Sequence, residues 1–140
     1  MESGTAMSLL SVENLEVSIR TRDGRTVLPV RSASFTVAPQ ETLALVGESG
    51  CGKSMTCLAL SGLLPRRAVI SGGSALYGET DIARTDRRTM RRLRRSDISV
   101  IFQDATNGLN PVKPIGWQIA EAVRLRGGGS GRAAAAEAVD

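Results

Sequence analysis

The chain has 140 residues, enough for one domain, and its 41% hydrophobic and 23% charged residues are typical of a globular protein. Its net charge of +4 rests on sixteen arginines and two lysines, Lys53 and Lys113. Histidine is absent, so a general base would have to be a carboxylate, and two cysteines exclude a disulfide framework. We expect neither a signal peptide nor a membrane span, because no apolar run approaches ~20 residues.

The first part of the chain is predicted to form β-strands. Leu15, Val17 and Ile19 alternate with polar residues, as in a strand with one buried face. The Asp23-Gly24 pair then predicts a hairpin turn into residues 26–30. Residues 34–37 and 42–46 are predicted as two further strands. The second of these, "TLALV", is almost continuously apolar, which indicates a strand covered on both faces.

The segment after this strand is predicted to be a glycine-rich loop and a helix. The loop is "GESGCGKS", residues 47–54. In the following "MTCLALSGLLP", apolar residues recur at helical spacing until Gly62 and Pro65 stop the run. The order is therefore strand, loop, helix.

The remaining elements continue an α/β pattern. "SALYGETDI" predicts a strand and turn, and "TDRRTMRRLRRSD" a short helix capped by Thr85 or Asp86. "DISVIF" predicts another apolar strand ending before Gln103, and one apolar face begins a helix at Ile115. The stretch "RGGGSGR" predicts a flexible joint, and "AAAAEAVD" the start of a further element. Together they indicate an α/β sheet with an antiparallel subdomain.

Residues 47–54 match G-x-x-x-x-G-K-S/T, the Walker A loop. In such a loop the backbone N–H groups surround phosphates at a helix N-terminus. Lys53 would bridge the β and γ phosphates, and Ser54 would give its hydroxyl to Mg²⁺. Gly50 and Gly52 allow close approach of the backbone. A plain glycine turn is the alternative, and the flanking strand and helix favour the phosphate loop.

Longer segments around the loop point to one family. From Leu9 to about Leu125 they are "LLSVENLEV", "ETLALVGESGCGKS", "LSGLLP", "ISVIFQDATNGLNP" and "IGWQIAEAVRL". The chain resembles the N-terminal portion of the ATP-binding subunit of ABC transporters, in the dipeptide/oligopeptide importer branch. The resemblance implies a P-loop NTPase core, incomplete at its C-terminus, with an N-terminal antiparallel β-subdomain. Residues 1–126 would be the N-terminal part of the ATP-binding domain, and 127–140 a joint and the truncated start of the helical subdomain.

The resemblance assigns roles to particular residues. Lys53 and Gln103 would be catalytic, with Gln103, at the Q-loop position, contacting Mg²⁺ and the attacking water. Mg²⁺ would be held by Ser54 and Gln103. ATP would be bound by Gly47, Glu48, Ser49, Gly50, Cys51, Gly52, Lys53, Ser54 and Met55. The chain departs from the family near Ile19 and Arg20, where an aromatic residue usually stacks on adenine.

Several sequence motifs that the family uses for ATP hydrolysis have no match in this chain. They are the LSGGQ signature, the Walker B strand ending in Asp-Glu, the D-loop and a switch histidine. "ISGGS", residues 70–74, precedes Gln103 and leads into a strand, so it is not the signature. "ISVIFQD" is followed by Ala105 where a Walker B strand has its glutamate. We therefore expect little hydrolysis by this chain alone, and poor solubility, because strand 42–46 lacks a neighbour.

The resemblance predicts an ATP-binding component of an ABC importer, coupling MgATP binding and hydrolysis to transport, of peptides in this branch. Its partners would be transmembrane permease subunits, a second ATP-binding subunit and, indirectly, a solute-binding protein. Its place would be peripheral, at the cytoplasmic face of the membrane. One alternative is a truncated, non-catalytic nucleotide-binding fragment that docks on a membrane partner through residues 104–125.

A basic nucleic-acid-binding protein is a second alternative, since residues 84–95 contain seven arginines. Aromatic residues for base stacking are missing nearby. A solvated helix face, or one facing anionic lipid, is favoured instead, and no nucleic acid is expected as a partner.

Overall fold

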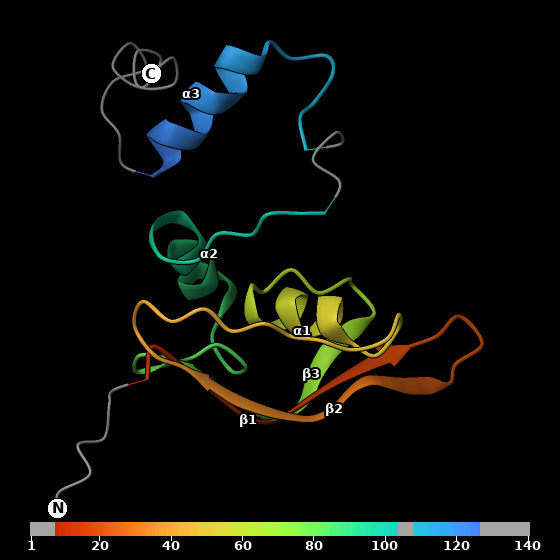
Figure 1. Ribbon diagram of the computed structural model, residues 1–140. Helices are drawn as coiled ribbons and strands as arrows, with labels where there is room; N and C mark the ends of the chain where they lie inside the picture. The colour runs from red at the N-terminus through yellow and green to blue at the C-terminus, as the bar shows by residue number, and fades with distance from the viewer. Residues whose placement is uncertain (1–7, 104–107, 127–140) are drawn as a thin grey trace, which may run out of the picture. The chain divides into compact units, whose positions relative to one another are not determined.

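A computed structural model describes residues 8–103 and 108–126 (Figure 1). The chain divides into two compact units, Met1–Met90 and Arg91–Asp140. The helices and strands, in chain order, are β1 (Leu10–Arg20), β2 (Thr26–Val37), α1 (Lys53–Leu60), β3 (Ala68–Tyr77), β4 (Thr80–Asp81), α2 (Arg87–Ser96) and α3 (Ile115–Leu125).

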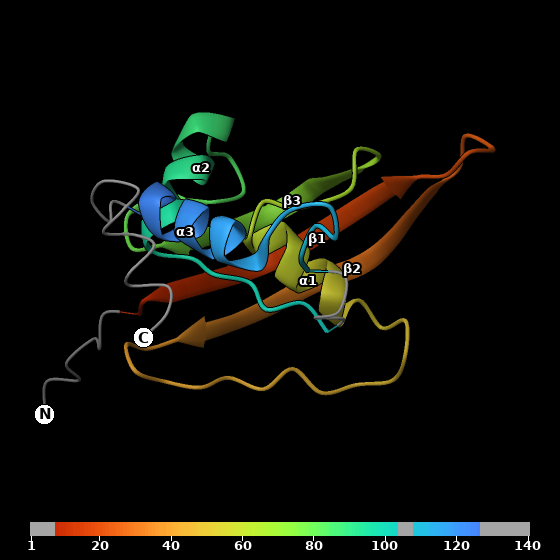
Figure 2. The ribbon, with the colours of Figure 1, turned by 90° about the horizontal axis from the view of Figure 1, so that it is seen from above.

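The first unit is built on a four-stranded antiparallel sheet in the order β2-β1-β3-β4. Helix α1 lies on one face of this sheet, across β1, β2 and β3 (Figures 1 and 2). The predicted inner face of β1 is confirmed for Leu15 and Val17, which are fully buried, while Ile19 is half-buried. Burial of these side chains holds the hairpin against the rest of the unit.

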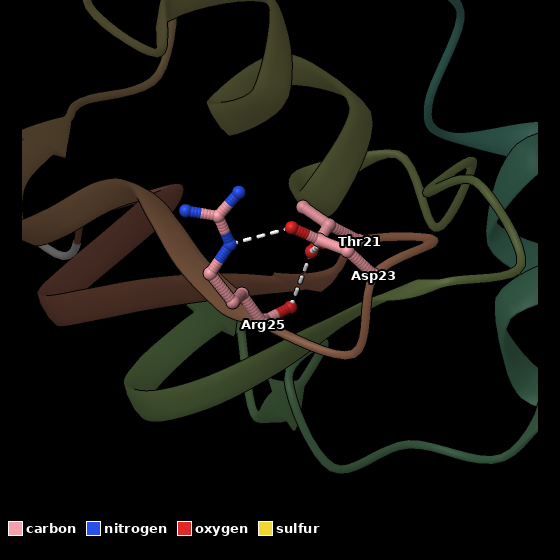
Figure 3. Close-up of polar contacts among 3 residues, drawn as sticks. All are labelled: Thr21, Asp23 and Arg25. Carbon is pink, nitrogen blue, oxygen red and sulfur yellow. Dashed lines mark hydrogen bonds and ion pairs between the residues drawn. The ribbon is translucent and has the colours of Figure 1, made fainter.

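The turn between β1 and β2 is the predicted Asp23-Gly24 turn. Gly24 has a φ of 85°, a left-handed conformation that costs glycine little. The Thr21 hydroxyl donates to the Asp23 carboxylate and to the carbonyl oxygen of Arg25, the second at 2.7 Å (Figure 3). Arg25 Nε donates to the other Asp23 oxygen at 2.5 Å. Together these bonds lower the pKa of Asp23, with the Thr21 hydroxyl as the larger cause and Arg25 as the second.

The three long strands carry bulges that the sequence pattern did not predict. Asn14 in β1 and Ser32 in β2 have φ values of 48° and 54°, and Gly73 in β3 has a φ of 79°. Each lies near a shift in strand register. The Ser32 hydroxyl donates to the Asn14 side-chain oxygen at 3.0 Å. The bulge at Asn14 separates buried Val12 and Leu15 by three positions and keeps both on the core face.

Two predicted strands are wrong. Residues 42–46 and 98–102 form no helix or strand; Val46 is 92% exposed and Ile101 97% exposed. A strand that is apolar on both faces needs paired neighbours at both edges and cover on both faces. Neither segment pairs with a strand of the described residues. Residues 34–37 are also not a separate strand, because β2 runs unbroken from Thr26 to Val37.

The helices largely follow the prediction. Asp86 caps α2, since its carboxylate accepts from the Thr89 N–H at 2.6 Å. Helix α1 ends with Ser61 as its C-cap, next to Gly62 with a φ of 64°. Its buried residues are Thr56 and Ala59.

Helix α3 begins at Ile115 as predicted, and none of its residues is buried. The predicted joint and final element, residues 127–140, lie outside the described residues, as do Asp104 and Ala105. None of the helices in the described ranges is long and apolar enough to cross a bilayer.

Candidate phosphate-binding loop

The glycine-rich loop runs directly into helix α1. Gly52 is the N-cap of the helix, with φ 96° and ψ 0°, and its carbonyl oxygen accepts from the Thr56 N–H at 2.9 Å and the Thr56 hydroxyl at 3.1 Å. The Cys51 N–H donates to the Glu48 carbonyl at 3.3 Å, which folds the loop into a turn. The first helical N–H groups have no acceptor within the helix, so its positive end faces the loop.

The two glycines before Lys53 are required for different reasons. A Cβ on Gly52 would stand 2.2 Å from the carbonyl oxygen of Pro29 and 3.3 Å from Val30 Cγ2, both in β2, so the loop backbone approaches the strand closely here. Gly50, with a φ of 83°, has nothing within 4 Å of the place a Cβ would take. Gly50 therefore serves the left-handed turn, and Gly52 serves both the turn and the close contact.

The Lys53 side chain folds back over the loop. Its Nζ donates to the carbonyl oxygens of Gly47 at 2.6 Å and Glu48 at 2.7 Å, and to Cys51 Sγ at 3.3 Å. An ammonium group has three donor hydrogens, so these three acceptors match its capacity. An anion that enters the loop must take over some of these hydrogen bonds.

Cys51 is exposed, and its thiol is affected by this lysine. The hydrogen bond from Lys53 is the largest cause that lowers the pKa of Cys51, and the lysine charge adds to it. Both favour the thiolate, because they stabilise negative charge on the sulfur. The loop thus stabilises an anion at Cys51.

A pocket lies between the loop and β2. Its volume is about 340 Å³, and its lining residues are Leu28, Pro29, Arg31, Gly50 and Cys51. Arg31 Nε donates to the Leu28 carbonyl at 3.3 Å, which holds the exposed guanidinium over this part of the strand. Sequence reasoning missed the strand side of the pocket. Pro29 within a strand was the available signal, since proline in a sheet marks an edge strand.

The structure brings most of the predicted site residues together. Gly47, Glu48, Ser49, Gly50, Cys51 and Gly52 form the loop, and Lys53, Ser54 and Met55 form the first turn of α1. Gln103 is exposed and belongs to the second unit, so its role stays a prediction.

The "ISGGS" segment lies within β3. This confirms that it leads into a strand and does not open a helix, as a signature would.

The family model of ABC transporters matches residues 30–131. This chain belongs to the ABC transporter family. The match includes the loop, α1 and most of the second unit, and it confirms the resemblance drawn from the loop and its flanking segments. The antiparallel sheet next to the loop agrees with the expected N-terminal β-subdomain.

Curated relatives agree with this assignment. A peptide import ATP-binding protein of Brucella abortus is 45% identical over 132 residues, which are 94% of this chain and 40% of the relative. The dipeptide transport ATP-binding protein DppD of Bacillus subtilis is 47% identical over 116 residues, 82% of this chain and 34% of that protein. The chain thus spans about 40% or less of the length of these relatives.

A solved structure shows the same fold. It is the dimeric, post-hydrolysis state of an ATP-binding cassette bound to ADP and Pi. The TM-score is 0.77 at 17% sequence identity, and the alignment covers 93% of this chain and 54% of that one. The fold is therefore that of an incomplete ABC ATPase domain, as expected from the sequence.

Proposed function

We propose that this chain is the N-terminal part of the ATP-binding component of an ABC importer for peptides, and that it binds MgATP at residues 47–55. The observation that carries the proposal is the Lys53 ammonium, held inside a loop of backbone groups at a helix N-terminus. The peptide class is supported by the printed names of the Brucella and Bacillus relatives.

Phosphate binding would replace some of the hydrogen bonds that Lys53 makes to the loop carbonyls. The β and γ phosphates would replace the carbonyls of Gly47 and Glu48 as acceptors for Lys53. The first N–H groups of α1 would donate to the same phosphates. Ser54, exposed in the first turn, would offer its hydroxyl to Mg²⁺, which commonly takes its other ligands from substrate phosphates and water.

The nucleoside would lie in the pocket beside β2. That pocket shares Gly50 and Cys51 with the loop, so a group attached to the phosphates can reach it. Leu28 and Pro29 offer apolar surface, and the Arg31 guanidinium offers a flat cation for stacking. This arrangement would hold adenine without the aromatic residue that is missing near Ile19.

Hydrolysis and transport would belong to the complete transporter. Gln103 would contact the Mg²⁺ and the attacking water there. The partners would be permease subunits at the cytoplasmic face of the membrane. A second ATP-binding subunit is supported by the dimer named in the solved structure. This chain alone would bind nucleotide weakly and turn it over negligibly.

Equilibrium binding of radiolabelled MgATP, with turnover followed in parallel, tests the proposal. Lys53→Ala should abolish binding, because it removes the central phosphate donor. Lys113→Ala is the matched control, since Lys113 is the second of the two lysines and stacks on Trp117, 5.0 Å from its ring centroid. Equal binding by both variants would refute the proposed site. A steady turnover that Lys53→Ala removes would refute the claim of inactivity.

A further inference from the structure

Helix α2 has one apolar face and one strongly basic face. Met90 and Leu93 are each 6% exposed and define the apolar face. At about 100° per residue, five of the six arginines of α2 fall opposite them in one continuous arc. We call this arc the arginine face; its residues are Arg87, Arg88, Arg91, Arg92 and Arg95, all described as exposed.

The charges of the arginine face have no acidic partners among residues 8–103 and 108–126. No ion pair found there involves any of the five guanidinium groups. The carboxylates that flank the helix are engaged elsewhere: Asp86 accepts from the Thr89 N–H, and Asp97 accepts from the Ser96 hydroxyl at 2.5 Å. The five exposed guanidinium groups are therefore not held in ion pairs within the described residues.

This arrangement costs helix stability. Arg87, Arg91 and Arg95 follow one another at i, i+4 spacing, where like charges repel. The first turn contains no acidic residue and two arginines, which oppose the positive end of the helix dipole. A surface of fixed negative charges would relieve both effects.

We propose that the arginine face of α2 binds the phosphates of an anionic phospholipid bilayer. Juxtamembrane clusters of four to eight basic residues bind such surfaces, and five lie on this one helix face. No aromatic or large apolar side chain shares the face, so the contact is electrostatic and does not require insertion. Single-stranded nucleic acid is disfavoured, because it needs stacking side chains. The choice of lipid rests on the proposed function, which places the chain beside a membrane.

Co-sedimentation of the chain with vesicles tests the proposal. One set of vesicles contains equal parts of phosphatidylglycerol and phosphatidylcholine, and the other contains phosphatidylcholine alone. The chain should bind the first set, with an affinity that falls as salt is raised, and should not bind the second. Combined Arg88→Gln, Arg91→Gln and Arg95→Gln should weaken binding about a hundredfold, at about 1 kcal/mol per charge.

Two further variants separate the arginine face from net charge and from unfolding. Combined Arg20→Gln, Arg22→Gln and Arg66→Gln removes the same charge from exposed positions elsewhere and should leave binding within a few-fold of the parent. Combined Arg88→Lys, Arg91→Lys and Arg95→Lys should retain binding, because lysine keeps the charge and the helix propensity. Equal loss in both glutamine triples would overturn the proposal.

Binding of duplex DNA and binding of MgATP are two further measurements that test the proposal. Tighter binding to duplex DNA than to the anionic vesicles at the same salt concentration would overturn the lipid assignment. MgATP binding, measured on the same samples, should be unchanged by substitutions in the arginine face. A chain that binds MgATP but not the anionic vesicles would therefore refute this inference and leave the nucleotide site standing.

Discussion

The carbonyl oxygen of Pro29 lies 2.2 Å from the position that a Cβ on Gly52 would occupy. This contact joins β2 to the start of α1 without any side chain from the loop. Glycine is therefore needed at position 52 for the packing of the loop against β2, whether or not a phosphate is bound.

Gly52→Ala should destabilise the chain by roughly 2–4 kcal/mol. A left-handed φ costs alanine about 1 kcal/mol, and the clash with the Pro29 backbone adds about 1–3 kcal/mol. Gly50→Ala is the matched control, since its φ is similar but its surroundings are open, and it should cost only about 1 kcal/mol. Urea unfolding curves measure both. Equal midpoints would show that the Pro29 contact is unimportant.

Cys51 should be alkylated by iodoacetamide at a lower pH in the folded chain than in the unfolded chain. Lys53 lowers the pKa of Cys51, so the thiolate forms below the ordinary value of about 8.5. In a Cys57→Ser background, Lys53→Met should move the midpoint of the plot of alkylation rate against pH to a higher pH. An unchanged curve would contradict the Lys53 contact.

MgATP should protect Cys51 from the same reagent, because Cys51 lies in the loop and lines the pocket. The measurement is the labelling rate with and without nucleotide. The labelling rate in inorganic phosphate at the same concentration is compared with the rate in MgATP. Equal labelling with and without MgATP would argue against nucleotide in the loop.

Arg31→Ala should weaken ATP binding about fivefold and leave tripolyphosphate binding unchanged. Stacking of a guanidinium on a flat ring contributes about 1 kcal/mol, and tripolyphosphate has no ring. Competition against labelled ATP measures both ligands. Arg66→Ala, at an exposed position outside the pocket lining, is the control and should alter neither. A similar loss for both ligands would show that Arg31 acts only as a positive charge.

Polar replacement of the exposed apolar residues should raise solubility without loss of stability. Val46→Ser and Ile101→Ser change side chains that are 92% and 97% exposed, so each should shift unfolding by less than about 0.5 kcal/mol. Leu15→Ala, at a position with 0% exposure, should cost about 2–5 kcal/mol. Static light scattering and urea unfolding measure the two properties. Strong destabilisation by Val46→Ser would show that this segment is packed.

The Asp23 carboxyl should titrate below its ordinary value of about 3.9. Because the folded-state pKa is lowered, its stabilising effect is present above the unfolded value and is lost as pH falls through the folded one. Carboxyl NMR shifts follow the titration. Thr21→Val, which removes the larger cause, should raise this pKa more than Arg25→Gln does. The opposite order would assign the effect to Arg25.

Local patterns predicted the elements whose partners are close in sequence. The Asp23-Gly24 turn, the Asp86 cap and the loop-to-helix step at Lys53 all depend on hydrogen bonds within a few residues. The glycine-rich loop is predictable for the same reason. Its motif specifies backbone geometry and a lysine at fixed spacing, and the structure shows both in place.

The sequence by itself determined the family, the hairpin, the three helices of the described residues and the identity of the loop residues, because these follow from short-range chemistry. Only the tertiary structure decided which apolar segments are covered. Residues 42–46 have the pattern of a buried strand but lie exposed, since burial requires paired neighbours. The bulge at Asn14, the contact between Pro29 and Gly52 and the pocket under Arg31 likewise depend on residues distant in sequence. No local sequence pattern encodes such contacts, because they form only when separate strands and loops pack together.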